Sequence, residues 1–269
     1  MILFLLTAGL LLLVVGGELL VRGAVAIAKW LRVSPLLIGL TLVGFGTSTP
    51  ELVTSLQAAL EGSPGIAVGN VVGSNIANIL FILGISALIF PVAVSKAAFR
   101  RDGVVLALAV FMCLGAVLFG ELERIIGSVL VMFLIAYIVL AFIQERQSLA
   151  AVGTEPTSTT RNTQIWLQFL LLVAGLALTI LGARLLVSSA IDIAARLQVP
   201  DTIVGLTIVA VGTSLPELVT SLMAAFRKQG DLAFGNIIGS NIYNIFGILL
   251  NLHHNLFYSM NKLIQGSKT

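Results

Sequence analysis

Charged residues are scarce in this chain of 269 residues: only 10% are Asp, Glu, Lys or Arg, whereas 58% are hydrophobic. A soluble globular domain carries roughly 25% charged residues. The mean hydropathy of +1.09 agrees with this deficit. A chain with so few charges cannot cover a water-exposed surface, which excludes an ordinary soluble domain and predicts an integral membrane protein.

Cysteine and histidine are almost absent, with one Cys and two His. Cys113 lies inside an apolar run and has no second Cys to pair with, so we interpret it as a small packing residue. His253 and His254 stand near the C-terminal end, and two histidines are poor evidence for a metal site. No HExxH motif and no Ser–His pair before residue 253 is available, so we expect no enzyme and no cofactor.

The net charge of +3 does not indicate nucleic-acid binding, because the basic residues lie in separate loops rather than in one tract. Their distribution predicts orientation instead, since cytoplasmic loops of membrane proteins hold the excess of Lys and Arg. We expect a multi-pass protein of the cell (inner) membrane with its N-terminus outside. The residues that fall on the cytoplasmic side are Arg22, Lys29, Arg32, Lys96, Arg100, Arg101, Arg146, Arg161, Arg227 and Lys228.

Long apolar runs dominate the rest of the sequence, and a helix needs about 20 such residues to cross ~30 Å of hydrocarbon. The first run is not preceded by basic residues or followed by a cleavage site, so it is expected to be a span rather than a signal peptide. The runs predict an all-α polytopic fold. They cover residues 2–21, 33–57, 66–90, 103–120, 125–143, 164–187, 199–225 and 231–250.

An internal repeat relates the two halves of the chain. With a shift of 166 residues and no gap, GTSTPELVTSL at 46–56 matches GTSLPELVTSL at 212–222, and GNVVGSNIANI at 69–79 matches GNIIGSNIYNI at 235–245. Membrane helices share small residues by composition alone, but a shared Pro, Glu and Asn at one offset indicates duplication. The first copy contains an odd number of spans, so the second is predicted to enter the membrane upside down.

The repeat divides the chain into four predicted parts. Residues 1–143 form a first repeat of five transmembrane helices, and the polar segment 144–163 is a cytoplasmic linker. Residues 164–250 form a second repeat with three transmembrane helices, and 251–269 are an atypical C-terminal tail. The second repeat is therefore expected to lack its last two helices.

Two acidic residues, Glu51 and Glu217, lie deep inside apolar runs at equivalent positions of the repeat. An ionised side chain at that depth costs roughly 3 kcal/mol on insertion scales. No basic residue lies at comparable depth to pair with them, so a bound cation is favoured; a protonated structural Glu is the alternative. Pro50 and Pro216 precede them and are expected to break or bend the helix.

Oxygen-bearing side chains recur around each Glu at helical spacing. Hydroxyl residues lie three and four positions before it, and Ser and Asn recur every fourth residue in the following span, beside glycines whose expected role is close helix packing. Oxygen-only coordination suits calcium and sodium and argues against zinc, copper or iron. The oxygen-bearing residues that this spacing collects are Glu51, Glu217, Thr47, Ser48, Asn70, Ser74, Asn78, Thr213, Ser214, Asn236, Ser240 and Asn244.

The motifs GTSTPEL with GNVVGSN, repeated as GTSLPEL with GNIIGSN, resemble the paired alpha repeats of the calcium/cation antiporter superfamily, in particular its bacterial sodium/calcium exchanger branch. The resemblance covers roughly residues 1–250. It implies a ten-helix fold in which the second, third, seventh and eighth helices form the ion site and the first and sixth slide across it. It also implies that Glu51 and Glu217 are the central calcium ligands, joined by Thr47, Ser48, Ser74, Asn78, Thr213, Ser214 and Ser240. With Asn244 these residues make ten predicted ligands. Some relatives place an Asp where Asn244 stands.

The predicted function is exchange of external Na⁺ for internal Ca²⁺ by alternating access, with these two ions as substrates, the lipid bilayer as partner and no nucleic acid. A proton-coupled or other cation-coupled calcium antiporter is one alternative. A truncated cation-binding protein without transport is another, and a channel is a third. The oligomeric state is left open by the sequence.

Overall fold

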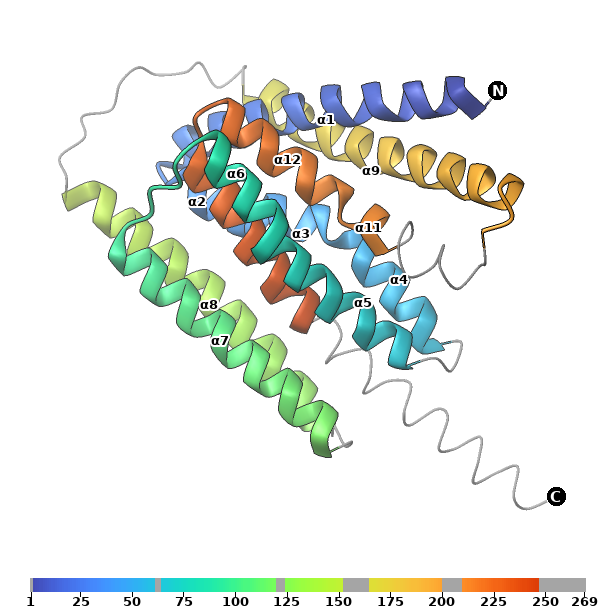
Figure 1. The fold of residues 1–269 in the computed structure, drawn as a ribbon. Helices are drawn as coiled ribbons and strands as arrows, with labels where there is room; N and C mark the ends of the chain where they lie inside the picture. The colour runs from blue at the N-terminus through green and yellow to red at the C-terminus, as the bar shows by residue number, and fades with distance from the viewer. Residues whose placement is uncertain (1, 61–63, 120–123, 152–164, 200–209, 247–269) are drawn as a thin grey trace.

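The computed structural model describes residues 2–60, 64–119, 124–151, 165–199 and 210–246 (Figure 1). Helices account for nearly all of these residues, and no strand occurs among them, which confirms the all-α fold. The first half contains α1 (Ile2–Leu31), α2 (Pro35–Ile38), the π-helix η1 (Gly39–Val43), α3 (Gly44–Thr47), α4 (Thr49–Leu60), α5 (Pro64–Ile76), the π-helix η2 (Ala77–Ile82), α6 (Leu83–Ile89), α7 (Lys96–Phe119) and α8 (Arg124–Ala151). The second half contains α9 (Ile165–Arg196), α11 (Ala210–Thr213), α12 (Leu215–Phe226) and a helix over residues 230–246.

Helices lie in each of the eight predicted apolar runs. Within the described ranges, three helices are long and apolar enough to cross a bilayer, and a bent pair makes a fourth. Large apolar side chains such as Leu3, Leu88 and Phe111 point outward and are at least two-thirds exposed, as a lipid-facing surface requires. The protein is therefore a multi-pass membrane protein.

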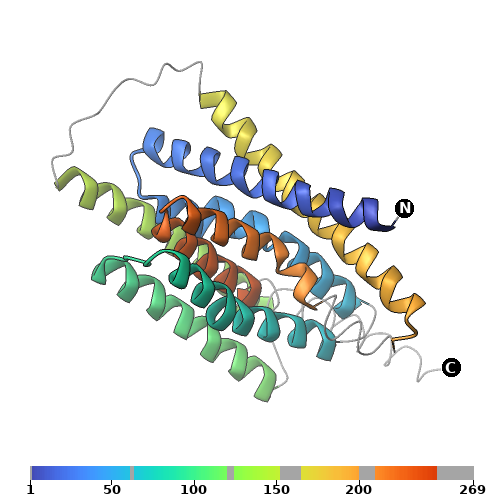
Figure 2. The same cartoon turned by 45° about the horizontal axis from the view of Figure 1, so that its top comes forward.

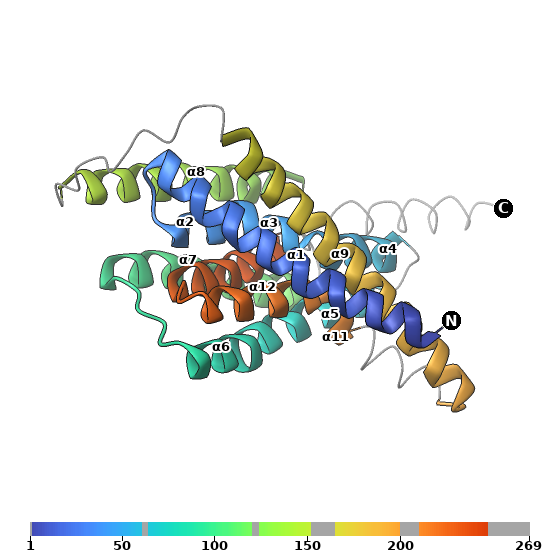
Figure 3. The same cartoon turned by 90° about the horizontal axis from the view of Figure 1, so that it is seen from above.

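The equivalent first helices of the two repeats, α1 and α9, pack along each other and make the most extensive contact between any two described elements. They lie side by side in Figures 1 and 2 and cross over the other helices in Figure 3. Gly9 of α1 faces Gly182 of α9, whereas Gly23 faces Leu172, so the two helices are antiparallel. Equivalent helices that run in opposite directions confirm the inverted repeat.

Glycines allow α1 and α9 to approach so closely. A Cβ atom on Gly16 would lie 2.6 Å from the backbone nitrogen of Thr179, and one on Gly175 would lie 2.3 Å from that of Leu20. Any larger residue would push the two backbones apart. This small-residue contact between membrane helices was not among the motifs that the repeat alignment singled out.

The glycine stripe that the alignment did single out has a packing role in the second repeat. A Cβ atom on Gly235 would lie 2.1 Å from the carbonyl oxygen of Leu36, and one on Gly239 would lie 2.3 Å from that of Leu40. The helix over 230–246 therefore packs directly on the backbone of α2 and η1. The counterparts Gly69 and Gly73 meet no described atom within 4 Å, and the segment equivalent to α2, residues 200–209, lies outside the described residues.

The predicted linker begins later than its composition indicated, because α8 continues to Ala151. Gln, Glu, Arg and Ala after residue 143 are good helix formers, so polarity alone does not end the helix. The extension is also anchored: Arg101 of α7 lies 3.5 Å from the carboxylate of Glu145. Residues 152–163 of the linker and the predicted tail, 251–269, lie outside the described residues, and the remaining domain boundaries stay predictions.

Candidate ion-binding site

The helix that carries Glu51 is broken just before it. Ser48 separates α3 from α4, and the two parts of the span are bent by 41°. In the second repeat Ser214 separates α11 from α12 in the same way. The prolines stand in the first turn of the following helix, where a missing N–H costs no hydrogen bond. The predicted break is confirmed, and the π-helix η1 adds a second irregularity of the kind found at functional sites.

The two acidic side chains, Glu51 and Glu217, are fully buried and meet where the two repeats come together. Ser214 donates a hydrogen bond of 3.1 Å to Oε1 of Glu51, and Ser48 donates one of 3.2 Å to Oε1 of Glu217. Each carboxylate is thus held by the serine of the opposite repeat.

No basic side chain in the described part of the chain neutralises these carboxylates. The ion pairs join Glu18 to two arginines and Arg101 to Asp102 and Glu145, all outside the site. The second oxygen of each site carboxylate, Oε2 of Glu51 and of Glu217, is buried and has no hydrogen-bond donor among the described residues. A buried oxygen without a donor calls for an explanation, and an unseen cation is one.

Hydroxyl groups surround the carboxylates. Thr47 donates a 3.2 Å hydrogen bond to Oδ1 of Asn236, and its hydroxyl lies 3.4 Å from that of Ser240. Ser240 in turn donates to the carbonyl oxygen of Gly44, 3.3 Å away and one turn before the helix break. Carbonyl and hydroxyl oxygens of both repeats therefore line one buried region.

Asparagine side chains donate hydrogen bonds to the backbone carbonyl oxygens of both acidic residues. Asn70 donates to the carbonyl oxygen of Glu51 at 3.5 Å and to Ser55 at 3.0 Å. Asn236 repeats this arrangement, with 3.4 Å to the carbonyl oxygen of Glu217 and 3.0 Å to a serine. These contacts obey the same shift of 166 residues as the sequence repeat. The repeat symmetry therefore extends to individual hydrogen bonds.

Asn78 and Asn244 depart from that symmetry. Asn78 donates to Oδ1 of Asn241 at 2.9 Å, whereas Asn244 donates to the hydroxyl of Ser74 at 3.3 Å. The side-chain oxygens of both asparagines are buried and lack a donor in the described structure. With Oε2 of the two glutamates they make four acceptor oxygens without donors.

The structure buries nearly all of the predicted ligands. Nine of the ten are buried, namely Thr47, Ser48, Glu51, Ser74, Asn78, Ser214, Glu217, Ser240 and Asn244. Thr213, at the end of α11 beside Ser214, is half-buried. No group of three or more His, Cys, Asp or Glu occurs among the described residues, and the predicted ligands carry two carboxylates with hydroxyl and amide oxygens. Such a set fits a hard cation.

One pair of contacts was missed by the sequence reasoning. Asn75 donates to the backbone carbonyl of Asn241 at 3.2 Å, and Asn241 donates to that of Asn75 at 3.5 Å. This reciprocal pair joins α5 to the helix over 230–246. Asn75 is not one of the residues that recur every fourth position. It directly follows Ser74, so its side chain lies about 100° around the helix axis from that of Ser74. The Ser–Asn pair that both repeats share could have indicated that Asn75 and Asn241 have equivalent roles.

Comparison with known proteins identifies the family. A family profile described as "Sodium/calcium exchanger protein" matches residues 1–143 and 167–249. The chain belongs to this family. Its members are transporters rather than enzymes, so the chain is a transporter of the calcium/cation antiporter kind.

Individual relatives agree with this membership of the exchanger family. The putative antiporter CaxA of Alkalimonas amylolytica is 38% identical over 247 residues, which cover 90% of this chain and 76% of CaxA. The sodium/calcium exchanger MaX1 of Methanosarcina acetivorans is 37% identical, with 90% of this chain and 79% of MaX1 covered. A structure of the sodium-calcium exchanger NCX_Mj superimposes with a TM-score of 0.83 at 36% identity, covering 94% of this chain and 83% of that one. The exchanger fold therefore extends over nearly the whole chain.

Proposed function

We propose that this protein exchanges Na⁺ for Ca²⁺ across the cell membrane at a site formed by Glu51 and Glu217. The observation that carries the proposal is the pair of buried carboxylates, each held by a serine of the opposite repeat and each with one oxygen lacking a donor among the described residues. The sodium/calcium exchangers among the similar proteins support the choice of ions.

Charge balance explains why such a site would exchange ions. Two carboxylates neutralise one Ca²⁺, and the surrounding oxygens of Thr47, Ser48 and Ser240 suit either Ca²⁺ or Na⁺. A site that holds one kind of ion excludes the other, so release of Ca²⁺ on one side is linked to entry of Na⁺. No cofactor beyond the transported ions is required.

Alternating access would use the antiparallel pair α1 and α9. Their glycine-mediated contact packs them closely against each other, and they also contact α2, η1, α3, α11 and α12 around the site. A unit that packs on the site from one side can move relative to it and open the site to alternate faces. The N-terminus of α1 is placed outside by the distribution of basic residues.

Proton-coupled calcium exchange is the second candidate. It is favoured by the neutral side chain of Asn244, which leaves Glu51 and Glu217 as the only carboxylates among the predicted ligands. The two glutamates would then carry protons on the return step. The two candidates share the site and differ in the driving ion.

Calcium uptake into vesicles that contain the purified protein distinguishes these possibilities. With Na⁺ inside and none outside, ⁴⁵Ca²⁺ is expected to accumulate in the vesicles, and the sodium ionophore monensin is expected to abolish the uptake. Protein-free vesicles and a pH gradient of the same size are the controls. Uptake driven only by the pH gradient would establish proton coupling, and calcium binding without uptake under either gradient would contradict transport.

A further inference from the structure

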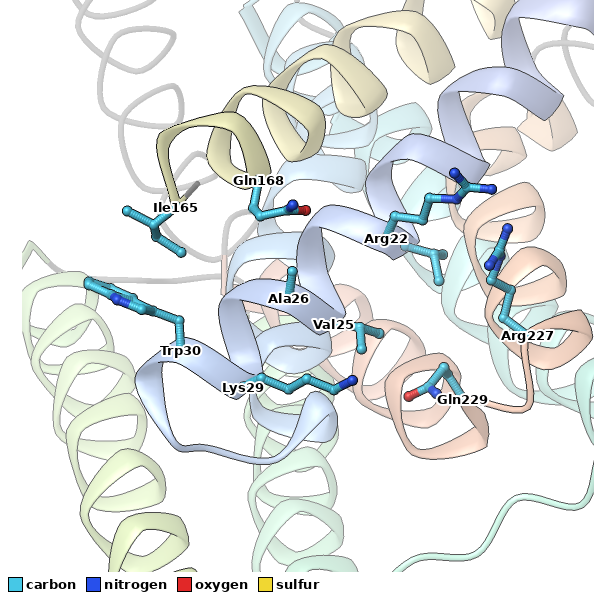
Figure 4. Close-up of a pocket in the computed structure, with 10 residues that line it drawn as sticks. Arg22, Val25, Ala26, Lys29, Trp30, Ile165, Gln168, Arg227 and Gln229 are labelled. Atoms are coloured by element: carbon cyan, nitrogen blue, oxygen red, sulfur yellow. The ribbon is translucent and has the colours of Figure 1, made fainter. Parts of the chain in front are cut away.

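A cavity of about 400 Å³ lies where α1 passes the N-terminal end of α9 and the C-terminal end of α12 (Figure 4). None of its lining residues belongs to the candidate ion site. Its apolar lining residues are Val21, Val25, Ala26, Ile165 and Trp30, of which Val21 is fully buried. The cavity is therefore amphipathic, because its remaining walls carry basic and amide side chains.

Three basic residues line this cavity: Arg22, Lys29 and Arg227. Glu18 pairs with both arginines, accepting from Nε of Arg22 at 2.5 Å and from Nε of Arg227 at 2.8 Å. In Figure 4 the two guanidinium groups point toward each other, and Lys29 extends toward Gln229. No ion pair joins Lys29 to any residue that the structure describes.

The local charge is therefore strongly unbalanced. Three cations and one carboxylate give the cavity a net charge of about +2, and Lys29 has no acidic partner in the described structure. Lys29 and Arg22 are exposed, so the cavity opens to the surface. An occupant that matches these walls needs an anionic group for the basic residues and an apolar part for the other wall.

We propose that this cavity binds the phosphate headgroup of an anionic phospholipid. The phosphate lies between Lys29 and the paired arginines, and Gln168 and Gln229 offer amide groups to the headgroup. An acyl chain follows the partly exposed apolar side chains of Val25, Ala26 and Ile165. Trp30 is 50% exposed, as expected of an aromatic residue at the membrane interface.

Charge complementarity favours this occupant over others. The three basic residues were assigned to the cytoplasmic side from the sequence, and the negative lipids of that leaflet attract basic groups with about 1 kcal/mol per Lys or Arg. A free phosphate ion would leave the apolar lining residues without a partner, and a neutral lipid would leave the net positive charge of the cavity unbalanced. A bound lipid would contact α1, α9 and the end of α12, and so connect the α1/α9 pair to the rest of the protein.

Fluorescence of Trp30 tests the proposal without any transport measurement. The chain has two tryptophans, so Trp166→Phe leaves Trp30 as the single reporter. The protein is reconstituted in phosphatidylcholine containing a small fraction of brominated phosphatidylglycerol, or the same fraction of brominated phosphatidylcholine. We expect stronger quenching by the anionic lipid, because it concentrates in the cavity beside the reporter.

Two lysine variants and competition by inorganic phosphate test whether the lipid preference comes from this cavity. Lys29→Gln is expected to reduce the preference for the anionic lipid about fivefold. Lys96→Gln removes an equal charge from an exposed position outside the cavity and is expected to leave the preference intact. Equal quenching by both lipids, or an unchanged preference in the Lys29 variant, would overturn the proposal. Loss of the preference on adding inorganic phosphate at constant ionic strength would identify a free phosphate site and overturn it as well.

Discussion

Glu217→Gln and Glu51→Gln are each expected to abolish sodium-gradient-driven calcium uptake in vesicles. Glutamine has nearly the same shape, and its side-chain oxygen still accepts the hydrogen bond from the serine of the opposite repeat. What each variant loses is one of the two negative charges that face the cation. The substitution therefore tests charge rather than packing.

The expected effect of each substitution is large because the site is fully buried. A unit charge interacts with another at 4 Å by about 4 kcal/mol at an effective dielectric constant of 20. Calcium, with two charges, loses at least that much, so its affinity is expected to fall by a factor of about 1,000 or more. Calcium binding by titration calorimetry and uptake of ⁴⁵Ca²⁺ measure the two consequences separately.

Glu145→Gln is the matched control, since it makes the same chemical change in α8, where the carboxylate pairs with Arg101 far along the chain from the ion site. It is expected to transport normally. Thermal unfolding of all three variants shows whether they are folded. Normal uptake in both site variants would reject the proposed site, whereas loss of uptake in the control would show that the assay responds to any lost carboxylate.

Gly175→Ala is expected to destabilise the protein and to impair transport. The added methyl group would lie 2.3 Å from the backbone nitrogen of Leu20 and 2.7 Å from the carbonyl oxygen of Gly16. Both are backbone atoms, so no side-chain rotation relieves the overlap and α1 must move away from α9. Overpacking of this kind costs typically 1–3 kcal/mol, which corresponds to a fall in Tm of roughly 5 °C.

Gly103→Ala provides the comparison, because a Cβ atom there meets no described atom within 4 Å in α7. Alanine is the better helix former, so the control is expected to be neutral or more stable by up to ~1 kcal/mol. Thermal melting in detergent, followed by circular dichroism, measures both. A Gly175→Ala variant as stable as the control would mean that the tight contact of α1 with α9 contributes little.

The fold was largely predictable because the sequence contains two clear patterns, the apolar runs and the internal repeat. Apolar runs predict where the helices lie. The repeat at an offset of 166 residues predicts that α1 and α9 are antiparallel, which the contacts of Gly9 with Gly182 and of Gly23 with Leu172 confirm. The end of α8 was not predictable in the same way. The polar residues after residue 143 predicted a linker. Their high helix propensity and the contact of Glu145 with Arg101 instead extend the helix to Ala151.

Candidate ligands were also predictable, since a carboxylate deep in an apolar run is costly and therefore stands out against its surroundings. Their partners were not. The exchange of serines between repeats, with Ser48 bonding Glu217 and Ser214 bonding Glu51, joins residues far apart in the sequence. Neither spacing nor periodicity within one helix contains that information.

The sequence by itself determined that this protein is a membrane protein and that it is built from two inverted copies. It also determined which oxygen-bearing residues belong to the buried region. Composition, apolar runs and an internal repeat can all be read from the chain without knowing its tertiary contacts. Only the tertiary structure decided which oxygens are left without donors, that Asn75 and Asn241 join the two repeats, and that Arg22, Lys29 and Arg227 line one cavity. Those features depend on how two distant helices rotate about their axes and approach each other, and backbone contacts at glycines such as Gly175 and Gly235 set that approach.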